Sequence, residues 1–142
     1  MKRCPELQNL SREHHSALKL TLHLKRAAAS GDEARIEAAC VRARDVFVNE
    51  LLPHFHEEED CLLPHLEAAG ANVVVARTLI EHRALQWLVR ELEVPDPEVL
   101  LRFAELMSEH VRFEERELFE VAEGELGREA LARILRRPGN AS

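Results

Sequence analysis

The chain has 142 residues, the length of one ordinary domain, and its composition is 46% hydrophobic and 32% charged. Its formal net charge of −7 argues against a nucleic-acid-binding surface, and no apolar stretch approaches the ~18–20 residues that a membrane-spanning helix needs. The three cysteines form no Cys-x-x-Cys pair and the first residues lack the apolar core of a signal peptide, so we expect a cytoplasmic protein.

Leucine, alanine, glutamate and arginine dominate the sequence, which predicts a helical fold. The first helix is expected from about Ser11 to Ala29, where apolar residues recur alternately every four and three positions. Gly31 then ends it, and Asp32 is the predicted N-cap of a second helix over about 33–68. Pro53 lies inside the second helix and should kink it, because its ring clashes with the carbonyl four residues earlier.

The later helices are expected over about 73–93, 97–122 and, as a short C-terminal fifth helix, 128–137. Asp96 followed by Pro97 resembles an N-cap and a first-turn proline, which marks the start of the fourth helix. Long helices with short connections predict an all-α fold, an antiparallel up-down-up-down four-helix bundle over about residues 10–122. The whole chain, residues 1–142, is expected to form a single domain.

One phrase occurs twice in the chain, about 56 residues apart. It reads His-x-x-x-Glu-Glu-x-x followed by two apolar residues, and it begins at His54 and again at His110. A helix advances about 100° per residue, so residues four apart lie one turn apart on the same face. His54 and Glu58 therefore point the same way, as do His110 and Glu114. Two such helices facing each other would supply two imidazoles and two carboxylates to one small volume, which outlines a metal site.

Each of the four long helices carries one histidine on its apolar face: His14, His54, His82 and His110. The pairs Glu13–His14 and Glu81–His82 also match one another. A polar residue at a core position is costly unless it is satisfied. An isolated buried histidine is usually a hydrogen-bonded core residue, so a purely structural bundle is one interpretation. Four such histidines, two of them with a carboxylate one turn away, favour a metal site.

The ligand types indicate which metal such a site would hold. Six imidazole and carboxylate ligands are too many for one closed tetrahedral zinc ion, and the cysteines form no thiolate pattern. Mixed ligands of this kind suit iron or manganese, and two carboxylates can bridge two ions. Ferritin-type bundles use Glu-x-x-His, whereas this chain uses His-x-x-x-Glu, which distinguishes the two families.

At these residues the sequence resembles the hemerythrin-like (HHE cation-binding) family over about residues 10–122, most specifically in the paired His-x-x-x-Glu-Glu phrases. The resemblance implies a non-heme di-iron centre inside the bundle, completed by a solvent-derived oxo or hydroxo bridge. Manganese or a mixed metal pair is the alternative. It also implies four terminal histidine ligands and two bridging glutamates, so the candidate ligands are His14, His54, Glu58, His82, His110 and Glu114.

Two positions depart from the oxygen-carrying members of that family. Where those proteins have a second histidine one turn after the first in the third helix, this chain has Gln86. Where they have an aspartate five residues after the last histidine, this chain offers Glu114 at four residues and Glu115 at five, so either could be the ligand. The remaining set looks more like that of the iron–sulfur-repair di-iron proteins and of the hemerythrin domain of an iron-sensing ubiquitin-ligase subunit.

Helical geometry directs the other histidines away from the candidate site. His15, His23 and His56 point to other faces and are expected at the surface, with a contact behind the metal ligands also open for His15. His65 shares the face of His54, but it lies ~16 Å further along the helix axis.

Several further residues are assigned to the core or to the surface. Cys61 and Val121 are expected to face inward, Cys61 as an inert core thiol or as part of the pocket lining. Trp87 and the phenylalanines are expected in the core. A solvated acidic face is expected, some members of which could accept hydrogen bonds from imidazole N–H groups: Glu57, Glu59, Asp60, Glu115 and Glu117.

These observations favour a small protein that holds two non-heme iron ions and binds or senses O2, NO or peroxide. One alternative is iron delivery or iron–sulfur repair through a labile site. Another is a redox enzyme that reduces peroxide or NO at the same centre, so the sequence leaves open whether the protein is an enzyme. The expected partner is a small ligand, with neither nucleic acid nor membrane involved.

Overall fold

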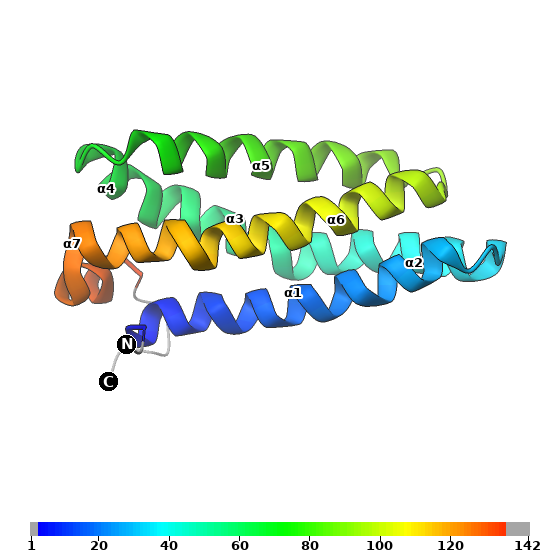
Figure 1. The fold of residues 1–142 in the computed structure, drawn as a ribbon, viewed down its shortest axis with the longest axis horizontal. Helices are drawn as coiled ribbons and strands as arrows, with labels where there is room; N and C mark the ends of the chain where they lie inside the picture. Colours follow the sequence, from blue (N-terminus) through cyan, green and yellow to red (C-terminus); the bar gives the residue numbers. More distant parts are fainter. Residues whose placement is uncertain (1–2, 136–142) are drawn as a thin grey trace.

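The computed structural model describes residues 3–135, and this part of the chain is helical throughout, apart from short turns. Figure 1 shows the long helical segments lying side by side along a common axis. The all-α antiparallel four-helix bundle expected from the sequence is therefore confirmed. Within residues 3–135, no helix combines the length and the apolar character needed to cross a membrane.

The first long helix, α1, spans Pro5–Ala29 and begins six residues earlier than expected, with Cys4 as its N-cap. A proline is tolerated in the first turn because the backbone N–H groups there have no partner within the helix. The next helix, α2 (Glu33–Val46), begins after Asp32, whose carboxylate accepts hydrogen bonds from two backbone N–H groups of the first turn. The predicted N-cap is thus confirmed.

The second long helix continues from α2 through two π-helical turns. It comprises η1 (Phe47–Leu51), α3 (Leu52–Glu57), η2 (Glu58–Leu62) and α4 (Leu63–Ala68). In a π-turn, a backbone N–H bonds to the carbonyl five residues earlier, which adds one residue to the turn. Pro53 and Pro64 each occupy the second position after such a turn. The wider turn relieves the clash of the proline ring with the preceding turn, so the disturbance expected at Pro53 takes this form.

The remaining segments are α5 (Asn72–Glu91), α6 (Pro97–Phe113), η3 (Glu114–Leu118) and α7 (Phe119–Ile134). Asp96 caps α6 through its side chain, as predicted. Within α7 the chain turns at Gly127, whose φ of 81° lies in the left-handed region that favours glycine. The fourth long helix therefore continues a few residues beyond its expected end, and a short fifth helix follows it. Residues 136–137, the expected end of that fifth helix, lie outside the described residues.

In the second and fourth long helices, the π-turns shift the buried face by one residue. η2 and η3 begin at the two glutamates of the repeated phrase. Past these turns the fully buried residues are Leu62 and Ala122, whereas Cys61 and Val121 are only half-buried. The expectation that Cys61 and Val121 face the core is therefore wrong, because the regular 3.6-residue period does not continue through a π-turn.

Buried apolar side chains form two clusters, and the polar candidate residues lie between them. The first cluster includes Ala17, Phe55 and Leu85, and the second includes Leu10 and Leu62. In the first three long helices, the chain passes from one cluster to the other across a candidate metal ligand, and in the fourth it does so between His110 and Glu114. The candidate site consequently occupies the middle of the bundle, with an apolar layer on each side of it.

Trp87 departs from the expected core. The five phenylalanines are buried as predicted, but the Trp87 side chain is 61% exposed on the outer side of α5. Val73 and Ile80 are also exposed, and the three residues follow one another at seven-residue spacing. α5 thus carries two apolar faces, and the face that contains Trp87 is the outer one.

Candidate metal centre

Six buried side chains converge in the middle of the bundle, and each of them is at most 3% exposed. They are His14 of α1, His54 of α3, Glu58 of η2, His82 of α5, His110 of α6 and Glu114 of η3. The structure therefore brings together all six side chains that the sequence indicated. They come from all four long helices, because each helix turns one ligand-bearing face toward the bundle axis.

The six side chains form two overlapping groups of four. One group contains the two histidines of the first half of the chain, and the other contains the two histidines of the second half. Both groups include Glu58 and Glu114, and the potential ligand atoms of each group lie within 4.8 Å of one another. Each group has the ligand types and the compactness of a metal-binding site, and the two share their carboxylates.

Glu58 directs one carboxylate oxygen to each histidine pair. Its Oε2 atom lies 3.2 Å from Nε2 of His54, and its Oε1 atom lies 3.1 Å from Nε2 of His82. The carboxylate therefore spans the two groups, as a bridging ligand must.

Glu114 spans the same two groups from the opposite helix. Its Oε1 atom lies 2.7 Å from Nε2 of His14, and its Oε2 atom lies 2.9 Å from Nε2 of His110. The two carboxylates thus take equivalent positions, in keeping with the repeated phrase in the sequence.

Several of these inward-facing atoms are unsatisfied. Within the described residues, both oxygens of Glu58, Oε2 of Glu114, and Nε2 of His82 and of His110 make no hydrogen bond. They lie close together without meeting in hydrogen-bond geometry. A buried polar atom without a partner costs about 1–3 kcal/mol, so native proteins seldom keep several at one place. Cations coordinated by these atoms would satisfy them, so the donor set fits a pair of metal ions.

The outer nitrogen of every candidate histidine, Nδ1, faces a further carboxylate. The Nδ1–oxygen distances are 2.6 Å for His14–Glu115, 2.8 Å for His54–Glu13, 2.7 Å for His82–Glu59 and 2.7 Å for His110–Glu81. An ionised carboxylate only accepts hydrogen bonds, so Nδ1 carries the proton and donates it. In the neutral ring, Nε2 is then the unprotonated nitrogen facing the centre. Metal-bound histidines are usually held in this way.

These four hydrogen bonds form a closed ring around the bundle, because each links one long helix to the next. The four acceptors also follow the repeat, since two directly precede a candidate histidine and two directly follow a candidate glutamate. The sequence left the roles of Glu59 and Glu115 open and gave no role to Glu13 and Glu81. The matching Glu-His and Glu-Glu doublets were the signal that could have identified all four.

Charges in the cluster raise the pKa of the histidines although burial opposes it. Burial alone disfavours the charged ring and lowers its pKa. The nearby carboxylates, Glu114 foremost and then Glu58 and Glu59, nevertheless raise the pKa of His82 to about 11. The charge of the adjacent Glu114 and the hydrogen bond to Glu81 raise the pKa of His110 to about 9. The cluster therefore favours positive charge at its centre, which metal cations would supply.

The two glutamates that follow α6 occupy different places. Glu114 is fully buried, with its carboxylate in the cluster. Glu115 is half-buried, and its carboxylate accepts hydrogen bonds from Nδ1 of His14 and from Oγ of Ser11. Of the two, Glu114 is consequently the candidate ligand. Gln86 is half-buried and belongs to neither group of four.

The other histidines lie outside the cluster: His15, His23, His56 and His65 are all exposed. A surface position was expected for the first three, whereas His65 was expected on the face of His54 but too far along the helix to reach the site. Cys61 packs against the apolar cluster around Leu62, and burial, together with the charges of Glu57 and Asp60, raises the pKa of its thiol. A raised thiol pKa disfavours the thiolate that binds metals, in keeping with an inert cysteine.

A comparison with protein families adds independent evidence. The family model described as Hemerythrin HHE cation binding domain matches residues 6–122. The chain belongs to this family. The match spans all six converging side chains, and membership of the hemerythrin family implies non-heme metal binding, which the buried histidine and glutamate cluster fits. Comparisons with curated proteins and with solved structures gave no match.

Proposed function

We propose that this hemerythrin-family protein holds two iron ions, bridged by Glu58 and Glu114, and that the centre binds or senses O2, NO or peroxide. The observation that carries the proposal is the sharing of both carboxylates by the two histidine pairs. A single ion would need only one group of four, whereas two groups with common carboxylates suit two neighbouring ions. Mixed imidazole and carboxylate donors suit iron, with manganese as the alternative.

The chain's own residues have distinct roles in this proposal. The four histidines would hold the ions through Nε2, and the outer carboxylates fix the orientation of each ring through Nδ1. Iron bound there would supply Lewis-acid and one-electron chemistry to a small ligand. The apolar layers on both sides of the cluster keep bulk water away from it.

Burial of the centre supports a small ligand. The candidate metal ligands are at most 3% exposed, so a molecule of a few atoms could approach the ions whereas a bulky substrate could not. Diatomic gases and peroxide meet this requirement. Their binding or sensing is therefore favoured over the turnover of a large organic substrate.

The proposal is tested by purifying the protein without oxygen, measuring its iron, and recording absorption spectra before and after adding O2, NO or peroxide. We expect about two irons per chain and new absorption bands when the ligand is added. Glu58→Ala should lose the two-iron stoichiometry, whereas Glu109→Ala, an exposed glutamate next to His110, should retain it. Two irons in Glu58→Ala would contradict the bridging role. Consumption of peroxide or NO over many cycles would instead identify a redox enzyme.

A further inference from the structure

The two halves of the candidate centre differ in how tightly one of their two outer carboxylates is enclosed. The other pair, Glu115 and Glu59, is similarly exposed, at 31% and 29%. Glu13 and Glu81 are equivalent, since each directly precedes one candidate histidine and accepts a hydrogen bond from another on the next helix. The Glu13 side chain, however, is 39% exposed and the Glu81 side chain only 14%. Glu81 also accepts a hydrogen bond of 3.0 Å from Arg77. The layer of outer carboxylates around the candidate ligands is therefore more open to solvent at Glu13 than at Glu81.

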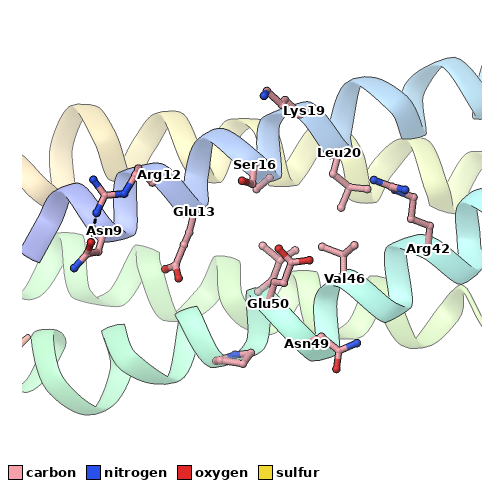
Figure 2. A pocket seen from close by; sticks show the side chains of 13 residues that line it. Asn9, Arg12, Glu13, Ser16, Lys19, Leu20, Arg42, Val46, Asn49 and Glu50 are labelled. Carbon is pink, nitrogen blue, oxygen red and sulfur yellow. Dashed lines mark hydrogen bonds between the residues drawn. The ribbon is translucent and has the colours of Figure 1, made fainter. Parts of the chain in front are cut away.

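A groove of about 600 Å³ lies between α1 and the segment formed by α2, η1 and α3, and Glu13 is part of its lining. We refer to it as the α1–α3 groove. Figure 2 shows Glu13 projecting from α1 into this groove, with Glu50 on the facing segment. The Glu13 carboxylate lies 2.8 Å from Nδ1 of His54. One side chain thus connects the groove to a candidate metal ligand.

The second outer carboxylate of the same half also borders a hollow. Glu115, the partner of His14, lines a hollow of about 610 Å³ together with Ser11 and Arg3. Its carboxylate is held by Ser11 at 2.9 Å and by Arg3 at 3.5 Å, in addition to His14. Both outer carboxylates of the His14–His54 half therefore line a solvent-accessible hollow, and Glu13 is the more exposed of the two.

The His82–His110 half is covered more closely at Glu81. The ring of His82 stacks on Phe55, with centroids 3.8 Å apart and planes inclined by 8°. Arg77 lies over the ring of Phe113 at 4.1 Å, outside Glu81. The hollow beside Arg77 encloses about 220 Å³, and its lining includes Arg77 and Phe113 but not Glu81. A molecule from solvent thus meets Arg77 before it meets the carboxylate.

We propose that the α1–α3 groove is the access route to the centre and that Glu13 closes its inner end. The position formed by His14 and His54 is then the one that exchanges its metal ion and meets small ligands first. The groove carries charges of both signs, including Glu50 and Arg42, which suits small neutral or singly charged molecules. The inference depends on the proposed function for the presence of two ions.

The test follows iron release from the fully loaded protein into excess bipyridine. Two phases of one iron each are expected, the first from the His14–His54 position. Glu81→Ala removes the same kind of hydrogen bond in the closed half, and it measures the cost of a lost acceptor, typically about 10- to 100-fold in metal affinity. Glu13→Ala should accelerate the first phase by about tenfold more than Glu81→Ala accelerates the second, because it also opens the route.

A groove-filling variant separates access from ligand orientation. Ser16 is exposed on α1 and lines the groove, so Ser16→Trp should slow the first phase and leave the second unchanged. Ala29→Trp, at the far end of α1, is the matched control and should change neither phase. Release of both irons in one phase, equal acceleration by Glu13→Ala and Glu81→Ala, or an unchanged first phase in Ser16→Trp would each overturn the access route. A protein that takes up no iron would instead contradict the proposed function.

Discussion

Nδ1 of His14 lies 2.6 Å from the carboxylate of Glu115, a residue 101 positions later in the chain. Ser11 and Arg3 hold the same carboxylate from the other side. Its neighbour Glu114 points into the cluster instead. One of these adjacent glutamates is thus a candidate metal ligand and the other a hydrogen-bond acceptor for His14, because successive residues of a helix point about 100° apart.

This division predicts different outcomes for two matched substitutions. Glu114→Gln replaces one bridging oxygen with an amide nitrogen, a poor metal ligand, so the protein should lose one iron. Glu115→Gln leaves every candidate ligand in place, so two irons should remain, with an affinity lower by about 10- to 100-fold. Metal analysis and iron titration of both variants measure the two effects. Loss of an iron from Glu115→Gln, with both retained in Glu114→Gln, would show that the assignment is reversed.

Iron should stabilise the fold. The metal-free cluster keeps several buried polar atoms unpartnered, and bound cations would satisfy them. With free iron at 100 times the dissociation constant, each site adds about 2.7 kcal/mol to the free energy of unfolding. At roughly 2–4 °C per kcal/mol, the melting temperature should rise by roughly 10–20 °C when both sites are filled. Anaerobic thermal melts with and without iron measure the rise, and Glu58→Ala is the control. An unchanged melting temperature in the native sequence would contradict a metal site.

Burial just past Glu58 predicts which of two neighbouring residues supports the core. Leu62 is fully buried, so Leu62→Ala should lower the free energy of unfolding by about 2–5 kcal/mol. Cys61 is half-buried, so Cys61→Ala should cost at most about 1 kcal/mol. Urea denaturation of both variants gives the comparison. A larger loss for Cys61→Ala than for Leu62→Ala would contradict this packing.

The π-turn at Glu114 predicts that one deletion is tolerated. Arg116 is exposed within η3, and its deletion removes the extra residue of the turn while Leu118 and Ala122 keep their buried places. The variant should fold, with helical circular dichroism and a cooperative thermal transition. Deletion of Glu105 in the regular part of α6 is the control, because it turns all later residues by about 100°. Equal loss of structure in both variants would argue against the π-turn.

The sequence predicted the converging ligands because regular helical periodicity holds from His54 to Glu58 and from His110 to Glu114. Beyond these two glutamates, helical periodicity did not predict the burial of Cys61 correctly. A π-turn changes which carbonyl each backbone N–H bonds to, and no residue type in the sequence specifies that change. Trp87 was misplaced because α5 carries two apolar faces, and hydrophobicity alone does not say which face meets the core. The outer acceptors Glu13 and Glu81 were missed although their Glu-His doublets match, because among 26 acidic residues such a doublet does not say which histidine the carboxylate meets.

The shared carboxylates have a mechanical consequence. Each candidate position takes three ligands from one half of the chain and a single glutamate from the other, Glu114 for the first half and Glu58 for the second. The halves are two helical hairpins joined at the turn near Gly70. Two bound ions would thus crosslink the two hairpins. Loss of iron would weaken the interface between the hairpins before either hairpin unfolded. The rigidity of the bundle would then depend on how much iron is available.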